Sequence, residues 1–285
     1  YGLNLILLIA VIFFGKEVMG AQRWLSVGGV RFQPSEISKA TTILILARFF
    51  SAAKGNNRVK DFFLPLGLVV LNAFLIFKQP DLGTAAILII LFAMMGFSSR
   101  VKKRYFTIVL LVGLLLLPLG WKLLEDYQKQ RLIVFLNPNV DPLGAGYTII
   151  QSKVAIGSGK LFGKGFLSGT QNQFNFLPER HTDFIFTVIA EEWGFFGGSV
   201  LLFVYWIILK KILDTARSLK DSFAQYLIQG ISSLFFLHIF VNIGMTLGVL
   251  PVVGLPLIFL SYGGTHLLVS FMLMGILFNI SQNQK

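Results

Sequence analysis

The residue in this sequence with the clearest capacity for chemistry is an aspartate, Asp183, at the start of a hydrophobic segment. It stands in the run LPERHTDFIF at 177–186, where a glycine-rich polar stretch gives way to apolar residues. A carboxylate at the mouth of a membrane span is costly to desolvate, so it is usually paired, hydrated or functional. If a helix starts near Thr182, Asp183 lies in its first turn, where the helix dipole favours the ionised form. Spacing alone leaves two roles equally open, a helix cap or a general base for a hydroxyl group.

Two more acids, Glu191 and Glu192, follow Asp183 within the same hydrophobic segment. Adjacent acids among apolar residues are unusual, because a buried carboxylate needs a partner. We therefore expect at least one of the two to face the interior of the protein.

A second group of polar residues occupies 22–39 and ends in the run RFQPSEISK. Pro34 suits the first turn of a helix, and the residues on either side of it are candidates for capping that helix. Glu36 and Lys39 are three residues apart, so they share one helical face and are close enough to pair. Two readings stay open for them: an ion pair that orients helices, or the lining of a cavity for a charged headgroup.

A third group is the run KQPDLGT at 78–84, in which Asp81 stands just before an apolar segment. An aspartate in that position favours the positive end of a helix, so capping is the simpler interpretation. We expect Asp81 to lie on the same side of the membrane as Glu36 and Lys39, which keeps a functional role open.

The basic, glycine-rich run from Lys153 to Gly169 has the composition of a phosphate-binding loop but not its pattern. The Walker motif fails, because no glycine stands five residues before Gly163 and no Ser or Thr follows Lys164. Lysines beside exposed backbone N–H groups would still suit a diphosphate. A solvated loop face is an equally good interpretation of the same residues.

The composition shows what kind of molecule must position these groups. The 285 residues are 55% hydrophobic and only 13% charged, with a mean hydropathy of +0.74. Several apolar runs approach the roughly 20 residues that cross a bilayer as a helix, so the chain is predicted to be an integral membrane protein. The absence of cysteine excludes disulfides and thiolate metal sites, and three scattered histidines argue against zinc.

We expect eight spanning helices, at about 1–15, 34–53, 62–79, 82–98, 105–124, 183–209, 222–248 and 256–279. The predicted fold class is therefore all-α, a polytopic membrane helix bundle that forms one domain over 1–285. The connection 125–182, between the fifth and sixth spans, has a length that is usually functional or disordered. Its many apolar residues argue against disorder, and residues 144–156 are expected to form a short amphipathic helix at the membrane interface.

The net charge of +12 would suggest nucleic acid binding in a soluble protein. In a membrane protein, however, basic residues accumulate in cytoplasmic loops. Here Lys and Arg gather at 48–60, 100–104 and 210–220, which fall on one side of an eight-span arrangement. That side is predicted to be cytoplasmic, and the opposite side carries the polar groups described above and the long connection.

Several runs of this sequence, taken in order, form a pattern that is specific to one family. They are QRWLSVGGVRFQPSEISK, KQPDLGTA, LNPNVDPLGAGYTIIQSKVAIGSGKLFGKGF, GTQ, FLPERHTDFIF, EEWGFFG and NIGMTLGVLPVVGLPLIFLSYGG. Through them the chain resembles the SEDS family (shape, elongation, division and sporulation), the family of RodA and FtsW. The resemblance covers essentially all 285 residues and is greater to the elongation type, RodA, than to the division type.

The resemblance implies a peptidoglycan glycosyltransferase that polymerises lipid II, an undecaprenyl-diphosphate-linked disaccharide peptide, outside the bacterial cytoplasmic membrane. It implies an inverting transfer that makes β-1,4-linked strands for cell elongation, with Asp183 as the catalytic residue. The family's polar cavity residues fall on Arg23, Arg31, Gln33, Ser35, Glu36, Lys39, Gln79, Asp81, Lys153, Glu179 and Glu192. Family members have ten spans, so the eight here are expected to be spans three to ten, with the first two missing.

The resemblance also implies partners and bears on cofactors. The expected partners are lipid II, a class B penicillin-binding protein and other membrane proteins of the elongation complex, with no nucleic acid. A divalent cation, Mg²⁺ or Mn²⁺, would suit the charge of a diphosphate, but the sequence offers no specific set of metal ligands.

Two departures from the family pattern occur near the last span. The chain has GLPLIF at 254–259 where the family usually has GLPLPF, and SYGGTH at 261–266 where it has SYGGSS. A proline is thus lost, and His266 replaces a small serine. Both changes are expected to alter the local shape of the cavity wall and not the chemistry.

A lipid II flippase is the alternative function, because a transporter of the same substrate also needs a polar intramembrane cavity and basic residues. Its polar residues should follow the whole path across the membrane, whereas the acids here gather at one face. A purely structural scaffold would leave the intramembrane charges unexplained.

Overall fold

The computed structural model describes residues 1–18, 21–27, 29–53, 59–174 and 176–282, so the expected basic loop at 54–58 lies outside the described residues. The chain divides into two compact units, each of which is described by itself. Unit 1 comprises Tyr1–Lys122, Lys211–Phe235 and Gly264–Lys285, and unit 2 comprises Leu123–Lys210 and Phe236–Gly263. The single domain expected over 1–285 stays a prediction.

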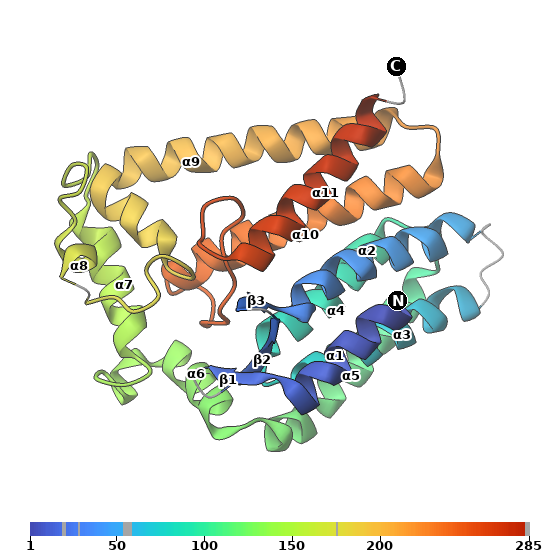
Figure 1. The fold of residues 1–285 in the computed structure, drawn as a ribbon, viewed down its shortest axis with the longest axis horizontal. Helices are drawn as coiled ribbons and strands as arrows, with labels where there is room; N and C mark the ends of the chain where they lie inside the picture. Colours follow the sequence, from blue (N-terminus) through green and yellow to red (C-terminus); the bar gives the residue numbers. More distant parts are fainter. Residues whose placement is uncertain (19–20, 28, 54–58, 175, 283–285) are drawn as a thin grey trace. The chain divides into compact units, whose positions relative to one another are not determined.

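Unit 1 is a bundle of apolar helices. They are α1 (Gly2–Phe14), α2 (Pro34–Ala52), α3 (Lys60–Phe77), α4 (Leu82–Phe97), α5 (Lys103–Leu123), α11 (Gly264–Gln282) and the part of α10 (Ser222–Thr246) up to Phe235. The helix α2 is central, because it packs against α1, α3, α4 and α11, and Figure 1 shows it beside α4. Its residues Ile43, Leu46 and Phe50 are fully buried, so a charge on the buried face of this helix must find a partner inside the protein.

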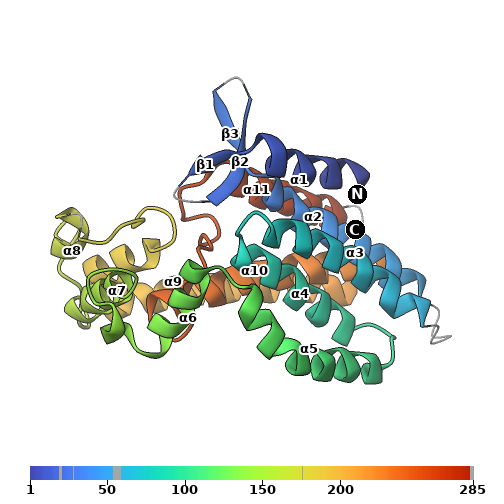
Figure 2. The ribbon, with the colours of Figure 1, turned by 90° about the horizontal axis from the view of Figure 1, so that it is seen from below.

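A small antiparallel sheet follows α1 in unit 1, between the helices expected at 1–15 and 34–53. Its strands are β1 (Lys16–Val18), β2 (Ala21–Val27) and β3 (Val30–Phe32), in the order β1-β2-β3, and Figure 2 shows them next to α1. Val27 pairs with Val30, and Gly29 has a φ of +84°, as tight hairpin connections require. The Val-Gly-Gly-Val sequence is the local signal of this hairpin.

Unit 2 contains the long connection between α5 and α9. Its elements are α6 (Asp126–Leu136), the 3-10 helix η1 (Pro138–Val140), α7 (Tyr147–Ser158), α8 (Thr170–Gln173), α9 (Ile185–Ser218) up to Lys210, and α10 from Phe236. The connection 125–182 is therefore largely helical, and the helix expected at 144–156 is present as α7. Figures 1 and 2 both place α7 and α8 beside the start of α9.

The helix α9 is broken at Gly194, whose backbone is not helical (φ 66°, ψ −160°). A break leaves N–H and C=O groups on both sides without their partners one turn away. In an apolar environment each unpaired group costs several kcal/mol. The expectation of one continuous span at 183–209 is therefore wrong in detail, because the helix is interrupted and continues to Ser218.

The segment 160–165 satisfies the backbone groups that the break exposes. The Lys164 N–H donates to the Glu191 carbonyl (3.0 Å), and the next N–H, of Gly165, donates to the next carbonyl (3.0 Å). Beyond the break, the Phe195 N–H donates to the first carbonyl of the segment (2.9 Å), and the following N–H donates to the following carbonyl (3.0 Å). The loop and the helix thus complete one another's hydrogen bonding.

All eight expected helices are present, as α1 to α5, α9, α10 and α11, and the all-α membrane-bundle class is confirmed. The last helix begins at Gly264 and not near 256, because Pro251, Gly254 and Pro256 interrupt the preceding segment. The basic stretch expected as a loop at 210–220 is mostly the end of α9. Among the described residues, α3, α9, α10 and α11 are long and apolar enough to cross a membrane, and α1 and α4 are shorter apolar helices.

The contact between the break and the loop predicts that Gly163→Ala destabilises the protein. Gly163 has a φ of +81°, and an added Cβ would overlap the backbone of Glu192. We expect a loss of at least about 1–3 kcal/mol in the free energy of unfolding, measured as a lower thermal midpoint in detergent. Gly157→Ala in α7 is the control, because its Cβ would meet nothing and alanine favours a helix by about 0.5–1 kcal/mol. Equal midpoints for the two variants would contradict this role of the loop.

Candidate functional site

Asp183 lies in a turn that precedes α9, not in the first turn of the helix. The turn is closed on Glu179, whose carbonyl accepts from the N–H groups of Thr182 (3.1 Å) and Phe184 (3.1 Å) and whose φ is +54°. These bonds occupy the residues that would otherwise begin the helix, so α9 starts at Ile185. The expected helix start near Thr182 is therefore wrong by three residues. Asp183 itself is half-buried.

The segment that follows α10 holds this turn from the other side. The side-chain NH₂ of Asn242, which is fully buried, donates to the carbonyls of both Asp183 (2.8 Å) and Leu255 (2.7 Å). Ser261 Oγ donates to the Thr182 carbonyl (2.5 Å). The backbone of the Asp183 turn is therefore fixed by residues from two distant parts of the sequence.

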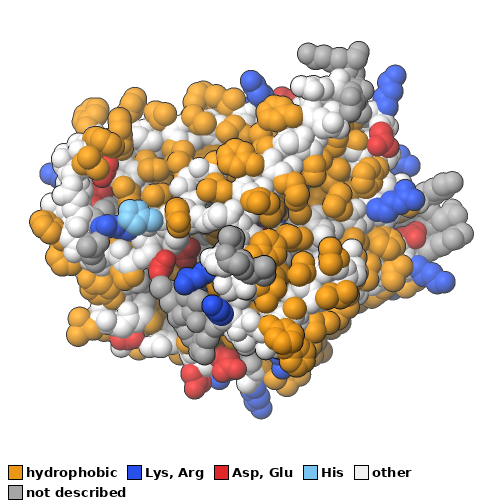
Figure 3. All heavy atoms as spheres, in the orientation of Figure 1, with side chains coloured by type: hydrophobic (Ala, Val, Ile, Leu, Met, Phe, Trp, Pro, Cys, Tyr) orange, Lys and Arg blue, Asp and Glu red, His pale blue; other side chains and the backbone are white. Residues whose placement is uncertain are grey.

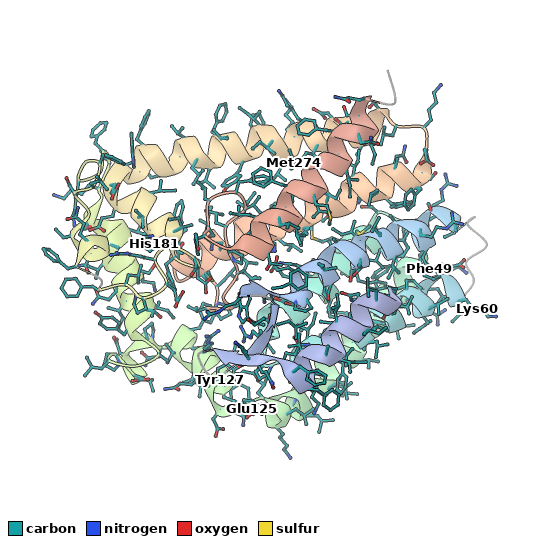
Figure 4. All side chains as sticks on the ribbon, viewed as in Figure 1. Phe49, Lys60, Glu125, Tyr127, His181 and Met274 are labelled. Atoms are coloured by element: carbon teal, nitrogen blue, oxygen red, sulfur yellow. The ribbon has the colours of Figure 1, made fainter. Side chains whose placement is uncertain are left out.

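A further hydrogen bond holds the same turn at His181, which Figure 4 labels. The N–H of Tyr262 donates to the His181 carbonyl (2.8 Å). The same histidine accepts on Nε2 from Arg180 Nε (3.1 Å). Sequence reasoning assigned no role to Asn242, Ser261 or Tyr262, although all three belong to the last run that carries the family resemblance.

The Asp183 carboxylate faces a glycine in the same segment. Gly254 has a φ of +71°, and a Cβ placed on it would lie 3.3 Å from Asp183 Oδ2. A side chain at this position would crowd the carboxylate, and the backbone conformation favours glycine. The absence of a side chain thus leaves space directly beside the acid.

Two other predicted residues of unit 2, Glu179 and Lys153, lie in the Asp183 turn and against the segment after α10 respectively. Glu179 is exposed, and its Oε2 accepts from Thr182 Oγ1 (2.9 Å). Lys153 on α7 is exposed and lies against Gly248, where a Cβ would overlap its Cε. Asp183 and Lys153 therefore both approach the segment after α10, at Gly254 and Gly248 respectively, and Glu179 shares the turn of Asp183.

The two adjacent acids of α9 are both buried, which confirms that at least one faces the interior. Glu191 Oε1 pairs with Lys164 Nζ (2.8 Å) and accepts from the Gln171 N–H (3.0 Å) and from Thr170 Oγ1 (3.4 Å). It therefore anchors the glycine-rich loop and α8. Glu191 was not among the predicted site residues, and Glu192 was.

The geometry of that loop bears on the diphosphate site considered for 153–169. The N–H groups of Lys164 and Gly165 are already used by carbonyls of α9, and the Lys164 ammonium is paired with Glu191. Lys164 and Gly165 therefore do not offer the exposed N–H groups that such a site needs, and a diphosphate site elsewhere in the run stays a prediction. The role of the loop here is to satisfy the broken helix.

In unit 1, the expected ion pair of α2 is confirmed and gains a third member. Lys39 Nζ lies 2.7 Å from Glu36 Oε1, and both residues are buried. The second carboxylate oxygen, Oε2, lies 3.2 Å from Nδ1 of His266 on α11. His266, one of the expected departures from the family pattern, thus links α11 to the charged pair on α2.

The start of α2 is as expected for Pro34, which is the first residue of the helix. The capping expected from its neighbours does not occur in that form, because Gln33 at the N-cap makes no side-chain cap bond. Its Nε2 donates instead to Ser35 Oγ (3.0 Å), and its backbone N–H donates to Thr265 Oγ1 (3.3 Å). The N-terminal end of α11 therefore holds the entry to α2.

The capping role of Asp81 is confirmed, since Oδ1 accepts from the Thr84 N–H (3.2 Å) at the start of α4. Arg23 of β2 approaches the same carboxylate (3.9 Å) and donates to the carbonyls of Gln79 (3.3 Å) and Pro80. The buried Gln79 donates to Leu8 in turn (3.0 Å). Arg31, by contrast, is exposed on β3.

Acidic and imidazole side chains do not gather into a metal centre within the described ranges. No group of three or more His, Cys, Asp or Glu residues there is placed to hold a metal ion. Mg²⁺ is usually bound through one or two carboxylates together with substrate phosphates, so the expected Mg²⁺ or Mn²⁺ stays a prediction.

This chain is similar to known proteins both in sequence and in structure. The family model for FtsW, RodA and SpoVE, described as cell cycle protein, matches residues 1–285. The peptidoglycan glycosyltransferase MrdB of Escherichia coli K12 is 44% identical over 286 residues, which cover 100% of this chain and 77% of that protein.

Solved structures agree with the sequence comparison. A chain in a structure titled structural coordination of polymerization and crosslinking by a peptidoglycan synthase complex superposes with a TM-score of 0.83 at 31% identity, over 99% of this chain and 80% of that one. The rod shape determining protein RodA of Thermus thermophilus superposes with a TM-score of 0.72 at 29% identity, over 99% of this chain and 76% of that one.

The buried pair of α2 generates a stability prediction. Lys39→Met removes the closest cation from a carboxylate that stays buried, so we expect a loss of about 3–5 kcal/mol in the free energy of unfolding. The double variant Glu36→Gln with Lys39→Met removes both charges and should recover most of that loss. Thermal midpoints in detergent measure both. A double variant no more stable than the single one would show that the pair is not the cause.

Proposed function

The chain belongs to the FtsW, RodA and SpoVE family of cell cycle proteins and is a multi-pass membrane peptidoglycan glycosyltransferase, and we propose that it polymerises lipid II by inverting transfer. The resemblance to the SEDS family is confirmed. The observation that carries the mechanism is the Asp183 carboxylate, fixed through its backbone by Asn242 and facing a position without a side chain at Gly254.

The bond changes define what the protein must supply. The donor glycan is α-linked to a diphosphate and the product bond is β-1,4, so the configuration at C1 inverts in one displacement. The 4-hydroxyl oxygen of the acceptor forms a bond to C1 of the donor while the bond from C1 to the diphosphate oxygen breaks. One base for the hydroxyl proton and stabilisation of the leaving diphosphate are sufficient.

In this proposal Asp183 accepts the proton of the acceptor hydroxyl. A general base must lie within hydrogen-bond reach of that proton, and a half-buried carboxylate on a fixed backbone can hold one orientation while substrates exchange. Stabilisation of the negative charge that develops on the diphosphate is assigned to Lys153, an exposed cation of the same unit. Its approach to Gly248 places it on the segment that also approaches Asp183.

Two cationic residues of unit 1 already make contacts within the protein. Arg23 already bonds two backbone carbonyls and approaches Asp81, and Lys39 is fully buried against Glu36. These contacts favour a role for Lys39 in holding α2, with its charge neutralised by Glu36. Diphosphate stabilisation by Arg23, Arg31 and Lys39 stays a prediction, and no step is assigned to a metal ion.

The cellular setting is part of the same proposal. We place the protein in the bacterial cytoplasmic membrane with Asp183 on the outer face, where lipid-linked precursors are polymerised for cell elongation. A class B penicillin-binding protein is the proposed partner. The likeness to a chain of a peptidoglycan synthase complex supports a partner that crosslinks the strands.

Replacing the base tests the mechanism. Asp183→Asn keeps the shape and removes the proton acceptor, so polymerisation of purified lipid II in detergent should fall by about 10²–10⁴-fold, with lipid II binding largely intact. Asp126→Asn, at an exposed position in the first turn of α6, is the control and should leave the rate unchanged. Full polymerase activity in Asp183→Asn would contradict the assignment of Asp183 as the general base.

The unmodified chain, tested in two assays, distinguishes the polymerase from the alternative function, a lipid II flippase. Glycan strands from lipid II identify a polymerase. No glycan, together with intact transbilayer movement of lipid II in vesicles, would instead identify the flippase. Neither product nor movement would leave only a scaffold role for this chain.

The space beside Asp183 generates a second activity prediction. Gly254→Ala adds a Cβ 3.3 Å from Asp183 Oδ2 at a φ of +71°, so the carboxylate or the backbone must shift. We expect polymerisation to fall by about 10-fold or more, the equivalent of roughly 1.4 kcal/mol, with little change in the KM for lipid II. Gly264→Ala in the same motif is the control, because its Cβ would meet nothing. A normal rate in Gly254→Ala would show that the close approach is unimportant.

A further inference from the structure

An apolar surface that no element of the described part of the chain covers lies on the loop that fills the break of α9. Phe162 is 82% exposed and Phe195, just after the break, is 71% exposed. The other large exposed hydrophobic residues of this surface, here called the break patch, are Leu161, Phe166, Leu167, Trp193 and Phe196. Figure 3 shows hydrophobic side chains along the edge that α9 follows in Figure 1.

The two halves of the break patch lie at the same level along α9. The N–H groups of Phe195 and Phe196 donate to consecutive carbonyls of the loop (2.9 and 3.0 Å). The loop residues must therefore lie at the level of the helix break and not beyond the end of the helix. A bilayer that reaches α9 at this level therefore also reaches the level of Phe162.

The dimensions of α9 place that level relative to the membrane. From Phe195 to the first lysine after it, Lys210, a helix rises by about 1.5 Å per residue, or roughly 22 Å. The hydrocarbon core of a bilayer is about 30 Å thick, and a lysine at the far end reaches the headgroups with its flexible side chain. The residues next to the break are thus at the membrane boundary or below it.

Three consecutive N–H groups and the one ammonium at the centre of the loop are paired inside the protein. The N–H groups of Gly163, Lys164 and Gly165 all donate to carbonyls, at 2.7, 3.0 and 3.0 Å. The Lys164 ammonium is neutralised by the fully buried Glu191 (2.8 Å). Non-helical backbone is tolerated at membrane depth only when its polar groups are satisfied in this manner.

We infer that residues 161–167 insert into the lipid bilayer at its interface and that the break patch binds acyl chains and headgroups there. Aromatic side chains are enriched at this depth, and the exposed Lys160 beside the loop suits an anionic headgroup. This part of the long connection between α5 and α9 is then a membrane insert and not a loop in water. The occupant is lipid because the patch is continuous with the surface of a membrane-spanning helix.

The natural absence of cysteine allows a direct test. Single variants Phe162→Cys, Phe203→Cys and Asp126→Cys of the full chain are labelled with a bimane fluorophore and reconstituted in vesicles of phosphatidylethanolamine and phosphatidylglycerol. Phe203 is an exposed residue of α9 and reports lipid contact, whereas Asp126 is fully exposed on α6 and reports water. Brominated acyl chains then quench only labels that touch lipid.

The expected result is quenching of the Phe162 label about as strong as that of the Phe203 label and several-fold stronger than that of the Asp126 label. Quenching at the level of Asp126 would overturn the inference. A Phe162 label that is quenched only at that level and becomes shielded when a protein partner is added would assign the patch to a protein instead. Phe166→Cys repeats the test if Phe162→Cys does not fold.

Discussion

Hydrogen-bonding groups released by the break at Gly194 are the constraint on which the structure of unit 2 depends. A membrane helix that stops and restarts must have its free carbonyls and N–H groups satisfied by another part of the protein. Residues 160–165 do so from both sides of the break, and the buried Glu191 holds the same loop through Lys164. The path of the long connection after α7 is therefore dictated by the helix that it precedes.

Unit 1 meets the same physical requirement with side chains. Glu36 and Lys39 are buried on the central helix α2, where neither charge is tolerable alone. Each carboxylate oxygen of Glu36 has its own nitrogen partner, Lys39 on one side and His266 on the other. The pair thereby connects α2 to α11, and a departure from the family sequence at His266 becomes part of the arrangement.

Features set within one helix could be predicted from the sequence, and features set by distant residues could not. The spacing of Glu36 and Lys39 determines a contact within one turn, and so does the position of Asp81 before α4. Hydropathy located the eight expected helices. The strands of β1 and β3 have three residues each, too few for an alternating pattern to show. The start of α9 and the position of Asp183 depend on Asn242 and on the segment after α10, and spacing carries no such information.

The hydrogen bonds that position Asp183 also impose an order on assembly. Its carbonyl is held by a residue 59 positions later in the chain, and the carbonyl of Thr182 by a residue 79 positions later. During synthesis α9 is complete well before these partners emerge. The turn can therefore take up its final geometry only after α10 and the segment beyond it have been inserted. The Asp183 carboxylate therefore stays unorganised in a nascent chain, and the geometry that the proposed catalytic role requires arises together with completion of the fold.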